Sequence, residues 1–152
     1  MSSVLHRTAE SLSVLGEAGF FRDLDDARRR AVLALSAVEE REAGEHFYRI
    51  GEPAQNFYVL MGGVVRLTIG LDHRNASAGD ILHRGEVFGW AALTPSANRR
   101  IASAVCLTPA SVLAIDGAGL VALMDRDHTL GYQLMRQLIL LVTGTLTACA
   151  AG

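Results

Sequence analysis

The chain has 152 residues, the length of one ordinary domain, and half of them are hydrophobic, which is enough to bury a sizeable core. Its formal net charge of −2 gives no broad attraction to a phosphodiester backbone, so nucleic acid is not an expected direct partner. Cys106 and Cys149 lie far apart and outside any CxxC pattern. This argues against a disulfide framework and predicts a reducing, cytoplasmic setting.

The first residues of the chain favour helices. The opening stretch carries charged side chains such as Arg7 and Glu10 among its apolar positions, which is typical of a short helix and not of a secretory signal. Asp25 and Asp26 precede an apolar run, where acidic residues stabilise the positive end of a helix dipole. We therefore expect residues 1–44 to form the N-terminal helical part of a single domain that spans the whole chain.

Between residues 45 and 115 the pattern changes to short β-rich runs separated by Gly, Pro, Asn and Asp. The predicted strands are residues 57–61, 64–69, 101–105 and 111–115. Gly62 and Gly63 lie between the first two runs and predict a tight hairpin, because such turns need positive φ. A further turn is expected within residues 72–75. This part of the chain therefore predicts an all-β roll or sandwich.

Residues 116–152 are expected to form C-terminal helices, the last of them starting near Thr129. Its apolar stripe consists of Leu130, Leu134, Leu138, Leu141 and Thr145. The uncharged stretch from Leu138 to Gly152 is shorter than the roughly 20 residues that span a bilayer, so no membrane contact is expected. A helix that is apolar on several faces must be covered. The cover is either a second copy, which gives a homodimer through this helix, or the helix's own domain.

The segment from Gly85 to Ser103 carries the most chemical information. Gly85 and Gly89 allow sharp turns and close approach to a ligand, and residues 89–93 predict one helical turn whose free amides face an anion. An arginine some ten residues later can close over such an anion bidentately. The alternative for Arg100 is a solvated loop side chain, and Arg99 is expected to lie in solvent.

These residues resemble the cyclic nucleotide-binding domain of the catabolite activator (Crp/Fnr) type of regulator. Residues 50–54, 57–60 and 63–65 resemble the family's glycine-glutamate turn, its tyrosine-bearing strand and its hairpin glycine. The resemblance covers nearly the whole chain. It implies a mainly β fold with flanking helices, namely a β-roll (a double-stranded β-helix, or jelly roll) followed by a long C-terminal helix.

The resemblance also implies a ligand site. Residues 85–103 correspond to the family's phosphate-binding cassette, in which Arg100, within the pattern Arg-x-Ala, holds the cyclic phosphate. The implied ligand-binding residues are Gly85, Phe88, Gly89, Trp90, Ala91, Ala92, Arg100 and Ile101, with Thr145 contacting the base from the last helix. The implied ligand is cyclic AMP, cyclic GMP or a related nucleotide, and no cofactor is required.

The sequence departs from the family at two cassette positions. The glutamate that receives the ribose 2′-hydroxyl is absent and Trp90 follows Gly89 instead, while Ile101 stands where the family often has a small hydroxyl residue. The ring of Trp90 has three interpretations: it stacks on a flat ligand, it fills the space of the sugar, or it packs between cassette and barrel.

Catalytic and metal-binding patterns are not readable in the sequence. The five histidines, His6, His46, His73, His83 and His128, show no metal-ligand spacing, and no Ser-His-Asp or Cys-His motif is present. We therefore predict a non-catalytic, signal-sensing module that binds a cyclic nucleotide or similar anion and transmits a conformational change, as in transcriptional regulators.

The alternative is a ligand-free dimerisation or protein-interaction module in which Trp90 fills the pocket. Regulators of this class usually continue into a DNA-reading helix-turn-helix, and the sequence stops at Gly152 without room for one. Direct DNA binding by this chain is therefore not expected.

Overall fold

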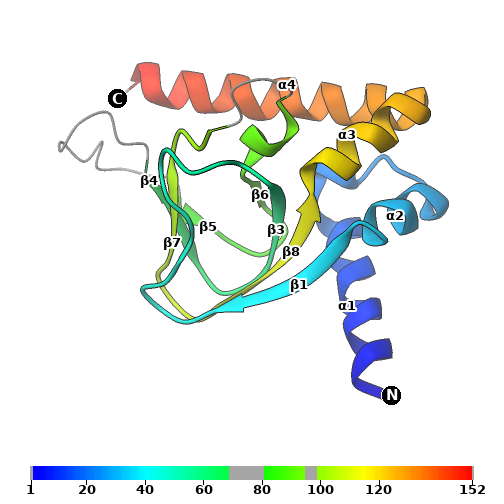
Figure 1. Cartoon of the computed structure of the whole chain (residues 1–152), viewed down its shortest axis with the longest axis horizontal. Helices are drawn as coiled ribbons and strands as arrows, with labels where there is room; N and C mark the ends of the chain where they lie inside the picture. Colours follow the sequence, from blue (N-terminus) through cyan, green and yellow to red (C-terminus); the bar gives the residue numbers. More distant parts are fainter. Residues whose placement is uncertain (1, 69–80, 95–98, 152) are drawn as a thin grey trace.

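The computed structural model describes residues 2–68, 81–94 and 99–151, with the side chains of residues 2–6 and 145–151 outside the description. Its strands form a roll, with α1 and α2 beside it and α4 lying across one end (Figure 1). The predicted fold class, a mainly β roll with flanking helices and a long C-terminal helix, is confirmed.

The N-terminal helices form where the sequence predicts them. They are α1 (Ser2–Glu17), the short 3-10 helix η1 (Gly19–Phe21) and α2 (Asp26–Leu33). The side chain of Asp25 accepts a hydrogen bond from the backbone N–H of Arg28, which satisfies one of the free amides at the start of α2. An N-terminal cap of this kind explains why the helix begins at the acidic run.

Eight strands form two four-stranded antiparallel sheets. The first contains, in spatial order, β1 (Ser36–Arg41), β8 (Ala110–Asp116), β3 (Asn56–Gly62) and β6 (Val87–Phe88). The second contains β2 (His46–Tyr48), β7 (Ser103–Cys106), β4 (Val65–Thr68) and β5 (Ile81–Leu82). The four strand predictions are thus confirmed in place, as β3, β4, β7 and β8.

The expected boundary between helical part and roll at residue 45 is wrong, because β1 already begins at Ser36. This strand carries Glu39, Glu40 and Arg41 and therefore has no apolar run that marks it as a strand. Its extended conformation is fixed instead by strand pairing, since all six residues pair in register with β8.

The expected hairpin at Gly62 and Gly63 is also wrong. β3 and β4 belong to different sheets, so the turn carries the chain from one sheet to the other without pairing the two strands. Gly63 does adopt the expected positive φ, of 85°, and a Cβ there would lie 2.3 Å from the carbonyl oxygen of Pro109. The turn expected at residues 72–75 lies outside the described residues.

Sheet β1-β8-β3-β6 separates two apolar clusters. Alternate residues of β3 face opposite sides, so Tyr58 and Leu60 enter the interior cluster of the roll, whereas Phe57 and Val59 enter a cluster shared with the helices. We call these the roll cluster and the helix cluster. The members that matter for the site are Phe47, Tyr48, Tyr58 and Phe88 in the roll cluster, and Ala91, Ala92, Leu120, Leu130 and Leu134 in the helix cluster.

The C-terminal helices are α3 (Gly117–Arg126) and α4 (His128–Ala151), which confirms the predicted start near Thr129. Leu130 and Leu134 are buried in the helix cluster, so the first half of α4 folds back on its own domain. Ile139 and Leu140, farther along, are 62% and 66% exposed. Among the described helices none is long and apolar enough to cross a bilayer.

Candidate functional site

Two glycines with positive φ shape the cassette segment. Gly85, at φ 89°, follows β5 and donates its N–H to the carbonyl oxygen of Leu60 over 2.8 Å. Gly89, at φ 83°, precedes the 3-10 helix η2 (Trp90–Leu93), which confirms the predicted helical turn. A Cβ on Gly89 would lie 2.9 Å from Nη1 of Arg100 and 3.0 Å from the ring of Tyr58, so the position has no room for a side chain.

Arg100 lies inside the protein, with only 4% of its surface exposed. Its backbone is fixed next to the glycine-glutamate turn, because its N–H donates to the carbonyl oxygen of Glu52 and its own carbonyl oxygen accepts from Gly51, both over 2.8 Å. The solvated alternative for Arg100 is therefore wrong. Arg99 is exposed as expected, and its Nη1 donates to the carbonyl oxygen of Gly51 over 3.2 Å.

The guanidinium of Arg100 is held by backbone carbonyls and aromatic rings. Nη1 donates to the carbonyl oxygen of Gly89 over 2.9 Å and Nη2 to that of Asn56 over 2.7 Å. Its central carbon lies 4.0 Å from the ring centroid of Tyr48 and 5.7 Å from that of Tyr58, within cation–π range of both. The guanidinium thus joins the cassette to β3 and to β2.

In the described part of the chain, no carboxylate lies within ion-pair distance of the Arg100 guanidinium, although the more distant charge of Glu52 acts to raise its pKa. Its Nε is buried, and no described group accepts a hydrogen bond from it. Burial lowers the pKa of the guanidinium from its ordinary value and raises the pKa of both the Tyr48 and the Tyr58 hydroxyls, so at neutral pH the rings are neutral. A buried cation that forms no ion pair is a natural site for an anion.

The other expected site residues lie in different surroundings. Phe88 is in the roll cluster, with its ring stacked 5.1 Å from that of Tyr58. Ala91 and Ala92 are buried in the helix cluster, on the opposite side of the sheet. Ile101 is 50% exposed. Thr145 belongs to α4, but its side chain lies outside the described part of the structure.

Trp90 is half-buried and packs against the helix cluster. This supports the third interpretation of its ring, as packing between cassette and the rest of the domain. The rings that surround Arg100 come from Tyr48 and Tyr58 instead. Sequence reasoning missed Tyr48, since nothing in the three-residue strand β2 distinguishes it from an ordinary core residue, and it missed Asn56, which contributes only a backbone carbonyl.

The cassette touches the C-terminal helices through backbone contact. A Cβ on Gly117, the first residue of α3, would lie 2.5 Å from the carbonyl oxygen of Ala92 in η2. The N–H of Gly117 donates to the carbonyl oxygen of Gln55, next to the Asn56 that holds Arg100. Because η2 and the start of α3 are in close contact, a displacement of η2 toward α3 requires the start of α3 to move.

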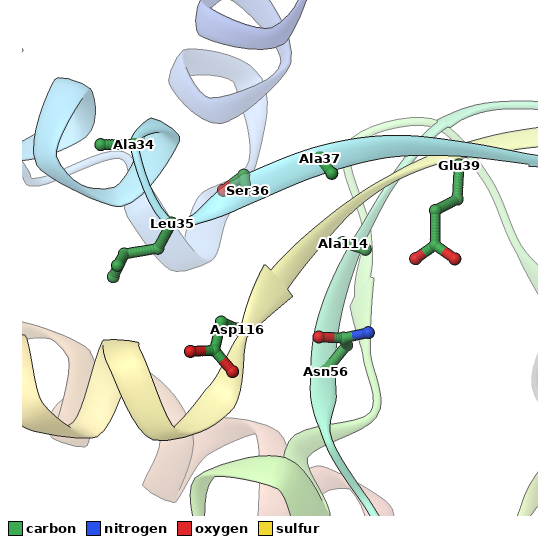
Figure 2. Close-up of a pocket in the computed structure, with 8 residues that line it drawn as sticks. All are labelled: Ala34, Leu35, Ser36, Ala37, Glu39, Asn56, Ala114 and Asp116. Carbon is green, nitrogen blue, oxygen red and sulfur yellow. The ribbon is translucent and has the colours of Figure 1, made fainter.

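A separate hollow of about 450 Å³ lies where β1, β3 and β8 meet the end of α2 (Figure 2). Its polar side chains are Ser36, Glu39, Asn56 and Asp116. Both carboxylates already serve local structure, since Glu39 pairs with Arg41 and Asp116 accepts the N–H of Gly119 at the start of α3. None of the expected ligand-binding residues lines this hollow, and no cluster of His, Cys, Asp and Glu in the described ranges is suited to hold a metal ion.

Comparison with known proteins agrees with this geometry. The sequence model of the family described as the cyclic nucleotide-binding domain matches residues 38–127, from β1 to the end of α3. No curated protein matches the sequence. Similar folds occur in many solved structures, of which three are described next.

The chain is similar to a protein from Geobacter metallireducens proposed to bind cyclic nucleotides, with a TM-score of 0.72 and 23% identity over 85% of this chain and 92% of that one. It is similar to the sensor domain of the transcriptional regulator DNR from Pseudomonas aeruginosa, with a TM-score of 0.74 and 18% identity over 94% of each chain. For the catabolite activator protein of Thermus thermophilus the TM-score is 0.72 and the identity 22%, over 87% of this chain and 62% of that one. At these identities the three likenesses show the fold alone.

We predict that Arg100→Ala lowers the free energy of unfolding by about 2–4 kcal/mol, because it removes a charge-assisted hydrogen-bond donor from each of the carbonyls of Gly89 and Asn56 and deletes a buried side chain. Arg99→Ala is the matched control, since its side chain is exposed, and we expect a loss of less than ~0.5 kcal/mol. Urea unfolding followed by circular dichroism measures both. Equal stabilities of the two variants would contradict the described role of Arg100.

Proposed function

The chain belongs to the cyclic nucleotide-binding domain family, and we propose that it is a non-catalytic, cytoplasmic signal-sensing module of the Crp/Fnr regulator type. In this proposal it binds a cyclic nucleotide or a similar anionic small molecule at the cassette and transmits a conformational change. Its ligand is drawn from the class of cyclic AMP, cyclic GMP and related nucleotides, it needs no cofactor, and this chain makes no direct contact with nucleic acid or membrane.

The observation that carries the proposal is the buried charge of Arg100. It lies 4% exposed beside the sharp turn at Gly89 and forms no ion pair with any described carboxylate. An anion that reaches this guanidinium gains charge-assisted hydrogen bonds in a site of low dielectric constant. The phosphate of a cyclic nucleotide has the charge and the oxygen geometry for such bonds.

The route of transmission that we propose starts at Gly89. Its carbonyl oxygen accepts hydrogen bonds from both Nη1 of Arg100 and the N–H of Ala92, so a movement of Arg100 acts directly on η2. From there the close contact between Ala92 and Gly117 leads to α3 and then to α4. A ligand shifts the helices only if these contacts differ between its bound and free states.

We further propose that α4 carries the change to a second copy of the chain. Tyr132, Met135, Ile139 and Leu140 are between 46% and 66% exposed, and the first three follow helical spacing along one side of α4. A row of large apolar side chains in water is typical of an interaction surface. A homodimer through this face places two cassettes beside one helix pair.

A specific observation also favours the rival function, a dimerisation or protein-interaction module without a ligand. The interior of the roll is filled by Phe47, Tyr48, Tyr58 and Phe88, whose ring centroids lie 5.1–6.2 Å apart in the contacting pairs. Arg100 is moreover supported by the protein's own carbonyls. The rival predicts that no nucleotide stabilises the fold.

Thermal unfolding with millimolar cyclic AMP, cyclic GMP or a cyclic dinucleotide separates the two functions. A ligand at 100 times its dissociation constant stabilises by about 2.7 kcal/mol, which raises the midpoint by roughly 5–10 °C for a domain of this size. Arg100→Lys keeps the charge but loses the planar fork, and we expect it to abolish the shift. Arg99→Ala is expected to retain it. No shift with any of the three nucleotides favours the rival module.

The dimer is tested by sedimentation. We expect the wild-type chain to sediment as a dimer and Ile139→Glu to sediment as a monomer, because a carboxylate cannot be buried in an apolar interface without a partner. Ala122→Glu adds the same charge at an exposed position of α3 and serves as the control. A wild-type monomer, or equal dissociation of both variants, contradicts an interface on this face of α4.

A further inference from the structure

Tyr48 lies outside the cassette and yet makes the closest ring contact with Arg100. The residue belongs to β2, is 6% exposed, and places its ring centroid 4.0 Å from the central guanidinium carbon. A separation this short puts the guanidinium on the face of the ring, where the negative side of the π-system attracts a cation. The contact therefore replaces part of the solvation that Arg100 loses on burial.

The orientation of the Tyr48 ring is fixed by its neighbours. It stacks on Tyr58 at 5.9 Å with an interplanar angle of 26°, and it lies 6.2 Å from Phe88 at 36°. Tyr58 and Phe88 are themselves stacked at 5.1 Å and 17°. Three rings from β2, β3 and β6 thus form one mutually packed cluster, and Arg100 lies against the ring that belongs to β2.

Three of the five N–H groups of Arg100 are engaged or enclosed in this pose. Each Nη atom donates one hydrogen bond to a carbonyl oxygen, and Nε is buried without an acceptor among the described residues. A bidentate grip on a phosphate uses two neighbouring N–H groups of one edge of the guanidinium. A phosphate that takes these N–H groups in place of the carbonyls draws the guanidinium away from Gly89, Asn56 and the Tyr48 ring.

We infer that Tyr48 is a positioning residue that holds the Arg100 side chain inside the roll, in a conformation that does not bind an anion. Anion binding at the cassette therefore competes with the Tyr48–Arg100 contact. This inference rests on the proposed function, in which Arg100 is the anion-binding group. According to this inference, Tyr48 of β2 lowers the affinity of the cassette for its ligand. A protein held in a non-binding pose has an apparent affinity reduced by the fraction of time it spends there.

Whether Tyr48 holds the Arg100 guanidinium is tested without a ligand, by the NMR signal of the Arg100 Nε–H group. This signal is assigned from its loss in Arg100→Lys. In the wild-type protein we expect this proton to be shifted upfield by the Tyr48 ring and to exchange slowly with water. Tyr48→Leu removes the ring and is expected to accelerate the exchange by at least ~10-fold, whereas Tyr48→Phe keeps the ring face and is expected to restore slow exchange. Rapid exchange and an unshifted signal in the wild-type protein overturn the inference even if Tyr48→Leu does not fold.

The competition is tested by calorimetric titration with cyclic AMP as the probe. We expect Tyr48→Leu to bind it ~10-fold more tightly than the wild-type protein and Tyr48→Phe to bind it within about twofold of the wild type. Equal or weaker binding by Tyr48→Leu, with slow exchange lost, overturns the competition. If none of the three proteins binds cyclic AMP, the proposed function fails for this nucleotide, and the Nε–H exchange rates still decide whether Tyr48 holds Arg100.

Discussion

A positive charge enclosed by the roll constrains the rest of this structure. Arg100 enters a space lined by aromatic rings, and an isolated charge in such a place is costly unless polar groups compensate for the lost water. The carbonyls of Gly89 and Asn56 and the face of Tyr48 provide that compensation. Gly89 must then lack a side chain, since a Cβ would lie 2.9 Å from Nη1. The buried guanidinium thus explains why glycine is required at the turn at residue 89, and why the carbonyl of Asn56 and the ring of Tyr48 face Arg100.

The same charge lies at a junction between two packing units. Sheet β1-β8-β3-β6 has the roll cluster on one face and the helix cluster on the other, and the cassette crosses from one to the other within four residues, from Phe88 to Ala92. Phe88 stacks in the roll, whereas Ala92 abuts the first residue of α3. A segment with contacts on both sides is suited to convert a local change at Arg100 into a movement of helices.

The sequence predicts most of the fold because its local signals agree with the final structure. The acidic start of α2, the apolar runs of β3 and β8, and the glycine before η2 each carry a physical reason that does not depend on distant contacts.

The sequence does not predict β1, because its charged sequence becomes a strand only through pairing with β8. The two glycines predict a hairpin at Gly63, where the chain in fact passes from one sheet to the other. A positive φ indicates a turn, but it does not determine which sheet the next strand joins. Arg100 is predicted through the resemblance of its Arg-x-Ala pattern to the family's cassette, whereas Tyr48 is recognised as its partner only once β2 lies beside the cassette.

A crystal structure of the protein grown with cyclic AMP tests the central claim most directly. The account predicts density for the phosphate within hydrogen-bond distance of the Arg100 guanidinium, which has left at least one of the carbonyls of Gly89 and Asn56. A nucleotide bound elsewhere, with Arg100 still donating to both carbonyls and resting on Tyr48, would contradict the account.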